Sequence, residues 1–238
     1  MVKLRDIWQR LYPYAVFRTG TDVYLTFDDG PIPEVTPKVL EILARYDVKA
    51  TFFMVGDNID KHRDIFRQVV EGGHLIGNHT YHHLNGWKTD FDTYMDDLAN
   101  TEDAIEMSLL PVWSAGLIRP PYGKATFLQR RYLHKLGYEL IYWDILTKDY
   151  DPHVTPEQML KKIQCEVRPG SIINFHDSLK SNERMLTVLP KAIEWLQAQG
   201  YTLRTLEDLA GISQRRKEYE ENTRSCINRS YRAGELRQ

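Results

Sequence analysis

Cysteine is scarce in this sequence, where 238 residues include only Cys165 and Cys226. Two isolated cysteines exclude a disulfide framework and a zinc knuckle, because both need several cysteines at set spacings. Cys165 falls in a segment of helical period, so we expect a small core side chain there and not a reactive thiol.

The sequence also lacks an excess of charge of one sign. It has 31 Lys and Arg residues and 33 Asp and Glu residues, for a formal charge of −2. This balance gives no electrostatic argument for nucleic acid or an anionic membrane as a partner.

The first 20 residues contain no continuous apolar run, because charged residues and Pro13 interrupt it. This pattern predicts neither a signal peptide nor a transmembrane segment. The simplest expectation is a cytoplasmic enzyme, with an oligomeric state that the sequence leaves open.

Short β-branched or aromatic runs alternate with segments of helical period. Thr36-Pro37 and Thr155-Pro156 each have the pattern of a helix N-cap followed by proline. The expected strands cover residues 23–28, 50–55, 74–78, 116–119, 138–145, 171–176 and 201–205. Seven strands that alternate with helices predict an α/β fold with a parallel sheet, either open or closed as a barrel.

Composition divides the chain into three parts. Residues 1–21 form an N-terminal extension, and residues 22–213 carry the alternating pattern of a single catalytic domain. Residues 214–238 are strongly charged and poor in apolar side chains, which is typical of an accessory helix or a solvated tail.

Polar clusters follow five of the expected strands. They are Asp28-Asp29, "NHTYHH" (78–83), "RPPYG" (119–123), "DILTKDYD" (144–151) and "NFHDS" (174–178). A lone acidic pair or a lone histidine is ordinary, but the carboxyl ends of barrel strands face one mouth. Five such clusters therefore predict an active site.

The histidines of the second cluster indicate a metal. His79 and His83 are four residues apart, so on a helical turn both rings would lie on one face. One carboxylate would complete a set of three ligands and leave coordination positions open for water and substrate, as in catalytic sites. One acid of the Asp28-Asp29 pair can then bind the metal, while the other serves as base to a metal-activated water. A set of two histidines and one aspartate suits zinc, cobalt or nickel.

The other clusters supply the remaining parts of a hydrolase. Arg119 is a fixed positive charge that could hold the base. Backbone N–H groups near Tyr122 and Gly123 could face an oxyanion. His176 is placed to protonate a leaving group, with a carboxylate tuning it. Together these parts describe the hydrolysis of an acyl bond, most naturally an amide or ester.

In combination, these motifs resemble the polysaccharide deacetylases, known as carbohydrate esterase family four. "TFDDGP", "HTYHH", "RPPYG", "WDILTKDYDP" and "FHD" follow the family's order and spacing from about Asp22 to about Leu209. The resemblance implies a distorted (β/α) barrel with about seven parallel strands. It also implies the removal of an N-acetyl or O-acetyl group from a sugar, an oligosaccharide or a glycan precursor, with one divalent metal ion, most often zinc.

The resemblance assigns a role to each matching residue. Asp28 is expected to be the base, His176 the acid, and Arg119 the residue that orients the base. The Tyr122 N–H is the expected oxyanion donor, and Asp149 the carboxylate that tunes the acid. The expected metal ligands are Asp29, His79 and His83, and the expected substrate contacts are Tyr150, Asn174, Trp87 and Pro120.

Two positions depart from the family pattern. Tyr150 stands where the family usually has tryptophan, and Asn174 where it usually has an apolar residue of the acetyl pocket. Asn174 could select a different acyl group, such as formyl, or it could turn away and form structural hydrogen bonds. Two other hypotheses therefore stand beside the sugar deacetylase. One is a metal-dependent hydrolase of a non-carbohydrate C–N bond or a formylated sugar, and the other is a glycan-binding module without activity.

Overall fold

The computed structural model describes residues 21–108 and 116–208. The predicted N-terminal extension, apart from residue 21, and the predicted charged tail lie outside these residues, as does Cys226. The N-terminal extension and the charged tail therefore stay predictions.

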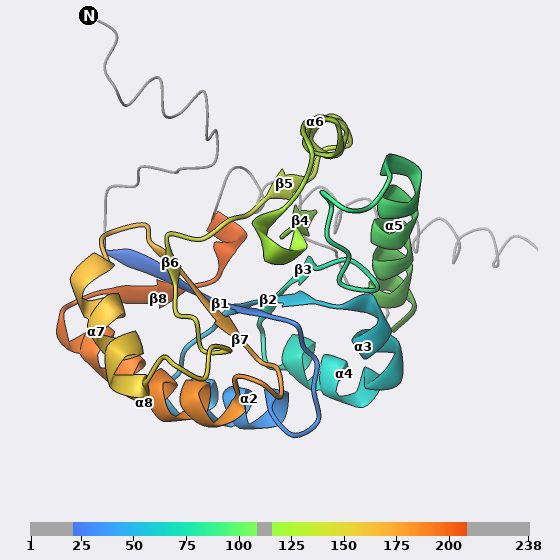
Figure 1. Ribbon diagram of the computed structural model, residues 1–238. Helices are drawn as coiled ribbons and strands as arrows, with labels where there is room; N and C mark the ends of the chain where they lie inside the picture. The colour runs from blue at the N-terminus through green and yellow to red at the C-terminus, as the bar shows by residue number, and fades with distance from the viewer. Residues whose placement is uncertain (1–20, 109–115, 209–238) are drawn as a thin grey trace, which may run out of the picture.

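The centre of the fold is a parallel sheet in the order β5-β4-β3-β2-β1-β7-β6, with β8 paired to β1 beside this path. Every strand pair is parallel. The seven strands of the path curl into a half-barrel, which confirms the predicted distorted (β/α) barrel (Figure 1). The strands are β1 (Asp22–Asp28), β2 (Thr51–Met54), β3 (Leu75–Asn78), β4 (Leu117–Ile118), β5 (Glu139–Leu140), β6 (Ile145–Leu146), β7 (Ile172–His176) and β8 (Thr202–Arg204).

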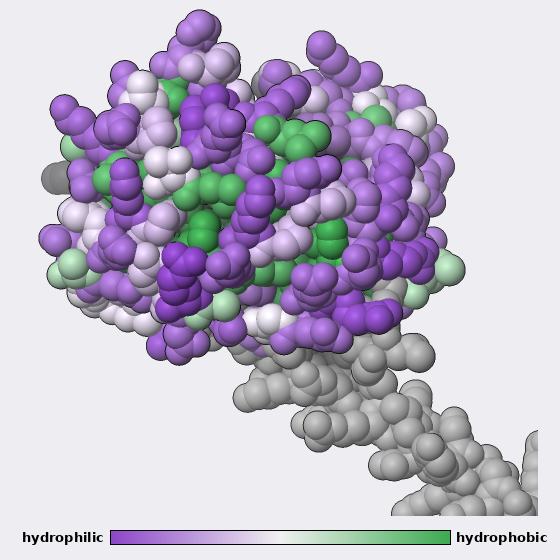
Figure 2. Space-filling view, turned by 90° about the horizontal axis from the view of Figure 1, so that it is seen from below, coloured by the Kyte–Doolittle hydropathy of each residue, from purple (hydrophilic) through white to green (hydrophobic). Residues whose placement is uncertain are grey.

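Helices surround this sheet in an arc that runs from α7 through α8, α2, α4 and α3 to α5, with α6 above it in the view of Figure 1. They are α2 (Thr36–Arg45), α3 (Gly56–Lys61), α4 (Arg63–Glu71), α5 (Phe91–Ser108), α6 (Phe127–Lys135), α7 (Pro156–Glu166) and α8 (Asn182–Ala198), and two 3₁₀ turns cover Pro121–Gly123 and Leu206–Asp208. Seen from below, the surface is mostly hydrophilic, with smaller apolar patches between polar side chains (Figure 2). In the described part of the chain, no helix has the length and apolar content needed to cross a membrane.

The side-chain alternation of β1 builds the core and the site together. Odd residues of β1, such as Phe27, join the large core beneath the helices, where the Phe27 ring stacks on Phe52 at 4.9 Å and on Phe175 at 5.7 Å. Successive strand residues point to opposite faces, so the even residues Thr26 and Asp28 point to the other face. One face is therefore packed against helices, and the other is free to carry polar chemistry.

One strand prediction was wrong in its extent. The apolar run 138–145 forms two short strands: β5, which pairs with β4, and β6, which pairs with β7. These strands lie at opposite ends of the sheet path, so residues 141–144 cross between its two edges. A continuous apolar run does not reveal such a crossing, because partners far away in sequence decide which strand each residue joins.

Three local predictions had different outcomes. The prediction of Thr155 as the N-cap of α7 is confirmed, and Thr155 also forms a capping box with Gln158. Thr36 is the first residue of α2 and not its N-cap: its hydroxyl accepts from the Ile32 N–H at 2.8 Å and donates to Asp177 Oδ2 at 2.6 Å. Cys165 is exposed on α7, so its prediction as a core side chain was wrong.

Candidate active site

The predicted catalytic clusters meet at the carboxyl ends of neighbouring strands. Asp28 ends β1 and pairs in register with His176, the last residue of β7. His79 follows β3 directly, and Arg119 follows β4 directly. Because all these strands are parallel, their polar ends lie at one edge of the half-barrel.

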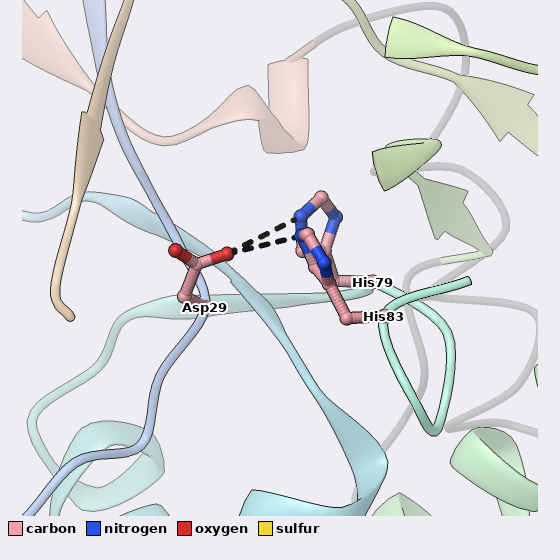
Figure 3. A group of neighbouring side chains, drawn as sticks. All are labelled: Asp29, His79 and His83. Atoms are coloured by element: carbon pink, nitrogen blue, oxygen red, sulfur yellow. Dashed lines mark ion pairs between the residues drawn. The ribbon is translucent and has the colours of Figure 1, made fainter. Parts of the chain in front are cut away.

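Asp29, His79 and His83 offer ligand atoms that all lie within 4.8 Å of one another. Asp29 Oδ1 is 3.3 Å from His83 Nε2 and 3.7 Å from His79 Nε2, and the side chains point toward one another (Figure 3). This oxygen is buried and has no hydrogen-bond partner among the described residues. A buried oxygen without a partner that faces two imidazole nitrogens fits a divalent metal such as zinc.

The His79 ring is oriented for metal binding. Its Nδ1 lies 2.7 Å from the Arg119 carbonyl oxygen, which can only accept, so Nδ1 carries the proton and Nε2 is free as a ligand. Burial lowers the pKa of His79 to about 4, which keeps the ring neutral near neutral pH. A neutral imidazole fixed through its other nitrogen is the usual state of a metal-binding histidine.

The loop that carries the two histidines differs from its prediction. Residues 79–83 form no helical turn; Thr80 and His83 adopt positive φ angles of 61° and 56°. The two rings still converge on Asp29, with centroids 5.0 Å apart. The irregular backbone, and not helical spacing, brings them together.

Asp97 of α5 holds this loop in place. Its Oδ2 accepts hydrogen bonds from the backbone N–H groups of Tyr81 at 2.8 Å and His82 at 3.0 Å. Its Oδ1 lies 2.6 Å from His82 Nδ1, so the His82 ring is directed to Asp97 and does not belong to the ligand set. No sequence pattern singles out Asp97, because an acid on a helix is ordinary.

Arg119 is fully buried and contacts the proposed base. Its Nη1 donates to Asp28 Oδ1 at 2.7 Å, to Thr26 Oγ1 at 2.8 Å and to Asn174 Oδ1 at 2.8 Å. Its guanidinium lies over the Phe53 ring, 4.1 Å from the centroid. A buried ion pair needs such additional hydrogen bonds to offset the loss of water.

The same guanidinium anchors the segment that crosses the open side of the half-barrel. Arg119 Nε donates to the Ile141 carbonyl at 3.3 Å, and Nη2 lies 3.4 Å from the Tyr142 carbonyl. Trp143, in the same segment, has its ring 5.8 Å from the guanidinium carbon. Arg119 therefore links Asp28 to the segment between β5 and β6.

His176 and Asp149 form the second half of the site. His176 Nδ1 lies 2.7 Å from Asp149 Oδ1, and the His176 N–H donates to Asp149 Oδ2 at 2.7 Å. Burial lowers the pKa of His176, but the Asp149 contact and the charges of Asp28 and Asp29 outweigh it and raise the pKa to about 9. His176 is therefore protonated near neutral pH, as a proton donor must be.

The predicted oxyanion turn lies beside the predicted metal ligands. Tyr122 has a φ of 59°, and its N–H finds no acceptor in the described part of the chain. Its ring is 60% exposed and meets the His83 ring edge-on at 4.8 Å. Pro120, which precedes this turn, is buried, and Gly123 takes a φ of 68° next to Trp143. An N–H without an acceptor next to the ligands is suited to an oxyanion.

The predicted substrate contacts occupy different environments. Trp87 is 65% exposed, with its Nε1–H on the Ala125 carbonyl at 3.2 Å and Lys124 Nζ 5.3 Å from its ring centroid. Tyr150 is 40% exposed and lies edge-on to His176 at 5.0 Å. Asn174 is fully buried, and its Nδ2 donates to Asp28 Oδ2 at 2.9 Å. Of the two interpretations of Asn174, internal hydrogen bonding is the one observed.

Asp177, for which the sequence predicted no role, fixes the turn that follows Asp28 and Asp29. Its Oδ1 accepts from the Gly30 N–H at 3.0 Å, and burial raises its pKa to about 8. A Cβ at Gly30 would lie 2.1 Å from Asp177 Oδ2, so the turn needs glycine at this point. The signal was present, since Asp177 belongs to the "FHD" motif.

Comparison with known proteins decides the family. Residues 18–141, just over half of the 238 residues, match the family model described as polysaccharide deacetylase. The chain belongs to the polysaccharide deacetylase family. This confirms the resemblance drawn from the motifs.

Relatives of this chain have named activities on acetylated glycans. A peptidoglycan-N-acetylglucosamine deacetylase of Bacillus cereus is 33% identical over 213 residues, which are 88% of this chain and 76% of the relative. A chitooligosaccharide deacetylase of Azorhizobium caulinodans is 32% identical over 80% of this chain and 95% of the relative. The crystal structure of a peptidoglycan N-acetylglucosamine deacetylase is similar with a TM-score of 0.77, at 32% identity, over 80% of this chain and 88% of that one.

Proposed function

We propose that this protein is a metal-dependent hydrolase that removes an N-acetyl or O-acetyl group from a sugar or glycan. One observation carries the proposal: consecutive carboxylates, Asp28 and Asp29, have opposite surroundings. Asp28 is hydrogen-bonded through both oxygens to Arg119 and Asn174, whereas Asp29 turns an oxygen without a partner to two imidazoles. This division gives one carboxylate to a metal and leaves the other beside it as a base.

We propose Asp29, His79 and His83 as the ligands of one divalent ion, with zinc the expected metal and cobalt or nickel able to replace it. A divalent ion polarises an acyl carbonyl and lowers the pKa of water when it is bound in such a site. The protein's own contribution is the fixed direction of the His79 ring, through its hydrogen bond to the Arg119 carbonyl.

The remaining residues handle protons and charge. Asp28 takes a proton from the attacking water, while Arg119 keeps the carboxylate in place. The Tyr122 N–H donates a hydrogen bond to the former carbonyl oxygen as negative charge develops on it. His176 then gives its Nε2 proton to the leaving nitrogen, so that the C–N bond breaks and acetate and a free amino sugar result.

An N-acetylated sugar within an oligosaccharide or glycan precursor is the substrate class we propose. The named activities of the B. cereus and A. caulinodans relatives support it. Trp87 and Tyr150 are exposed aromatic side chains suited to stacking on sugar rings. A cytoplasmic location stays a prediction from the sequence.

Among residues 21–108 and 116–208, no observation favours the C–N hydrolase outside carbohydrates or the hydrolase of a formylated sugar. Asn174 was the motive for that alternative, and its amide is used inside the protein. If the protein were a glycan-binding module without activity, Asp28 would be dispensable for its function. The substitution Asp28→Asn tests this alternative.

The test is acetate release from N-acetylated chitooligosaccharides and peptidoglycan fragments. The proposal expects release by the metal-loaded protein, loss after chelation, and recovery when zinc is added back. Absence of metal-dependent release from every acylated sugar would reject it.

A further inference from the structure

We infer that Asn174 is a positioning residue that fixes the second oxygen of the Asp28 carboxylate, an inference that rests on the proposed function. Asn174 lies on β7 opposite Thr26 of β1, two residues before His176. The two-residue period of the strands sends the side chains of Asn174, Thr26 and Asp28 to the same face of the sheet. The pairing of β1 with β7 therefore brings the amide to the base.

The amide closes a ring of hydrogen bonds around the base. Its Nδ2 donates to Asp28 Oδ2 at 2.9 Å, and its Oδ1 accepts from Arg119 Nη1 at 2.8 Å. Arg119 Nη1 donates in turn to Asp28 Oδ1 at 2.7 Å. The two oxygens of Asp28 are thus held by separate donors, one from β7 and one from the residue that follows β4.

Two donors constrain a carboxylate more than one donor does. With Arg119 alone, the Asp28 carboxylate could rotate about its last side-chain bond and carry the proton-accepting oxygen away from the water. Terminal torsions of this kind are soft, so an added contact is needed to hold them. Each carboxylate oxygen has further lone-pair capacity, so Asp28 can still accept a proton while both donors stay bound.

The position suits an amide for a chemical reason. Asn174 must donate to one group, Asp28, and accept from another, Arg119, and only a side chain with both functions satisfies the two partners. An aspartate would add a second negative charge against Asp28. A leucine would leave Asp28 Oδ2 without this donor, and a buried polar atom without a partner is costly.

The same contacts separate this role from that of an acyl-pocket wall. Asn174 is fully buried, and both ends of its amide are bonded inside the protein. A pocket wall would change the choice of acyl group, whereas a positioning residue changes the rate for every acyl group alike.

The test compares Asn174→Leu with the wild type on N-acetyl and N-formyl glucosamine oligosaccharides. We expect kcat to fall by about 10- to 10²-fold for both substrates, because a small misplacement of a catalytic group has effects of this size. KM and the affinity for zinc should stay within about twofold, since neither the metal ligands nor the exposed aromatics change. Asn174→Ala, which adds no bulk, serves as the second variant if Asn174→Leu does not fold.

The matched control is Thr147→Val. Thr147 is also buried, and its Oγ1 donates to the backbone carbonyl of Asn174 at 2.8 Å. The variant therefore removes a hydrogen bond to the same residue and leaves the contacts of the Asn174 side-chain amide in place. We expect its kcat to stay within about threefold of the wild type, because the ring of hydrogen bonds around Asp28 is preserved.

A second readout is a double-mutant cycle with Asp28→Asn. If Asn174 acts through Asp28, Asn174→Leu should cause little further loss of kcat in the Asp28→Asn background. An unchanged kcat in Asn174→Leu, or a changed ratio of acetyl to formyl turnover, would overturn the inference while leaving the proposed function standing. A wild type that is inactive on every acylated sugar would reject the proposed function itself, and with it this role.

Discussion

Asp28 and Asp29 are neighbours in sequence with the same side chain, yet they belong to different regions of the site. Asp28 is the last residue of β1, its side chain is 3% exposed, and both of its oxygens are hydrogen-bonded. Asp29 lies one residue beyond the strand, with a φ of 85°, and turns an oxygen without a partner to His79 and His83. The comparison shows that the end of the strand separates two carboxylates with different surroundings, which we propose as the base and a metal ligand.

The two regions are also held in different ways. The region around Asp28 is held from within the sheet by two buried side chains: Asn174 of the neighbouring strand β7, and Arg119, which directly follows β4. The region around Asp29 relies on loop 79–83, which Asp97 holds from α5. Substitutions in the first region should therefore change turnover, and substitutions in the second should change metal affinity.

The largest effect is expected from loss of a metal ligand. His83→Ala removes one of three ligands, so zinc affinity should fall by more than the roughly 10- to 100-fold that loss of an outer partner causes. Isothermal titration of zinc into the metal-free protein measures this affinity, and acetate release should become undetectable.

His82→Ala is the control for this change, because His82 lies in the same loop but its ring is bonded to Asp97. Its zinc affinity should stay well above that of His83→Ala. Equal losses in the two variants would contradict the ligand set.

The next largest effect belongs to the base. Asp28→Asn keeps the shape of the side chain but removes the proton acceptor, so kcat should fall by about 10²-fold or more. Steady-state kinetics of acetate release on a chitooligosaccharide measures the change. A variant that keeps its activity would show that Asp28 is not the base, and a wild type that binds glycan without turnover would favour the binding module.

Substitution of Asp97 tests how loop 79–83 is held in place. Asp97→Ala removes the acceptor for the backbone of Tyr81 and His82, so zinc affinity should fall by about 10-fold, with a smaller change in kcat at saturating zinc. Asp96→Ala is the matched control, since Asp96 is the exposed neighbour on the same helix. If both variants bind zinc as the wild type does, the loop does not depend on Asp97.

The pH dependence tests the proton donor. Because the pKa of His176 is raised to about 9, we expect activity to fall as pH rises through this value and His176 loses its proton. Asp149→Asn removes the carboxylate that raises the pKa, so this alkaline limb should move to lower pH. A rate profile from pH 6 to 10 for both proteins measures the shift, and an unmoved limb would contradict the assignment.

The free energy of unfolding should also depend on the protonation of His176. The folded pKa of His176 is raised above the usual histidine value of about 6.5. Its contribution to the free energy of unfolding is therefore fully present below about pH 6.5 and is lost as pH rises through about 9. Denaturant unfolding at several pH values measures it, and the difference between wild type and Asp149→Asn should shrink at high pH.

The smallest effect is expected at the rim of the site. Trp87→Ala removes an exposed aromatic ring, and KM for an oligosaccharide should rise by roughly 2- to 10-fold, with kcat nearly unchanged. Met107→Ala, another exposed apolar side chain, is the control and should leave KM unchanged. An unchanged KM in Trp87→Ala would remove Trp87 from the substrate contacts.

Much of this site could be predicted from the sequence, because the chemistry is carried by residue types at the ends of apolar runs. Asp28, Asp29, His79, Arg119 and His176 each lie at or just after an expected strand, and parallel strands bring such positions to one edge. The family motifs then predicted which acid faces the metal. Local patterns were enough wherever the strand itself sets the direction of the side chain.

The features that escaped prediction depend on contacts between distant residues. The run 138–145 contains a crossing between the two edges of the sheet, which its apolar composition does not show. The loop 79–83 reaches its shape through positive φ angles and Asp97, not through helical spacing. For Asn174 the sequence left two interpretations open, and only the pairing of β1 with β7 decides for hydrogen bonds to Asp28 and Arg119.

The division between the two carboxylates is tested most directly by zinc titration of Asp28→Asn and Asp29→Asn side by side. The structure predicts that Asp28→Asn binds zinc within a few fold of the wild type, because its side chain faces Arg119 and Asn174. Asp29→Asn should lose most of its zinc affinity, because its Oδ1 is the oxygen that faces both imidazoles. Equal zinc binding by the two variants, or a greater loss in Asp28→Asn, would contradict the assignment of base and ligand.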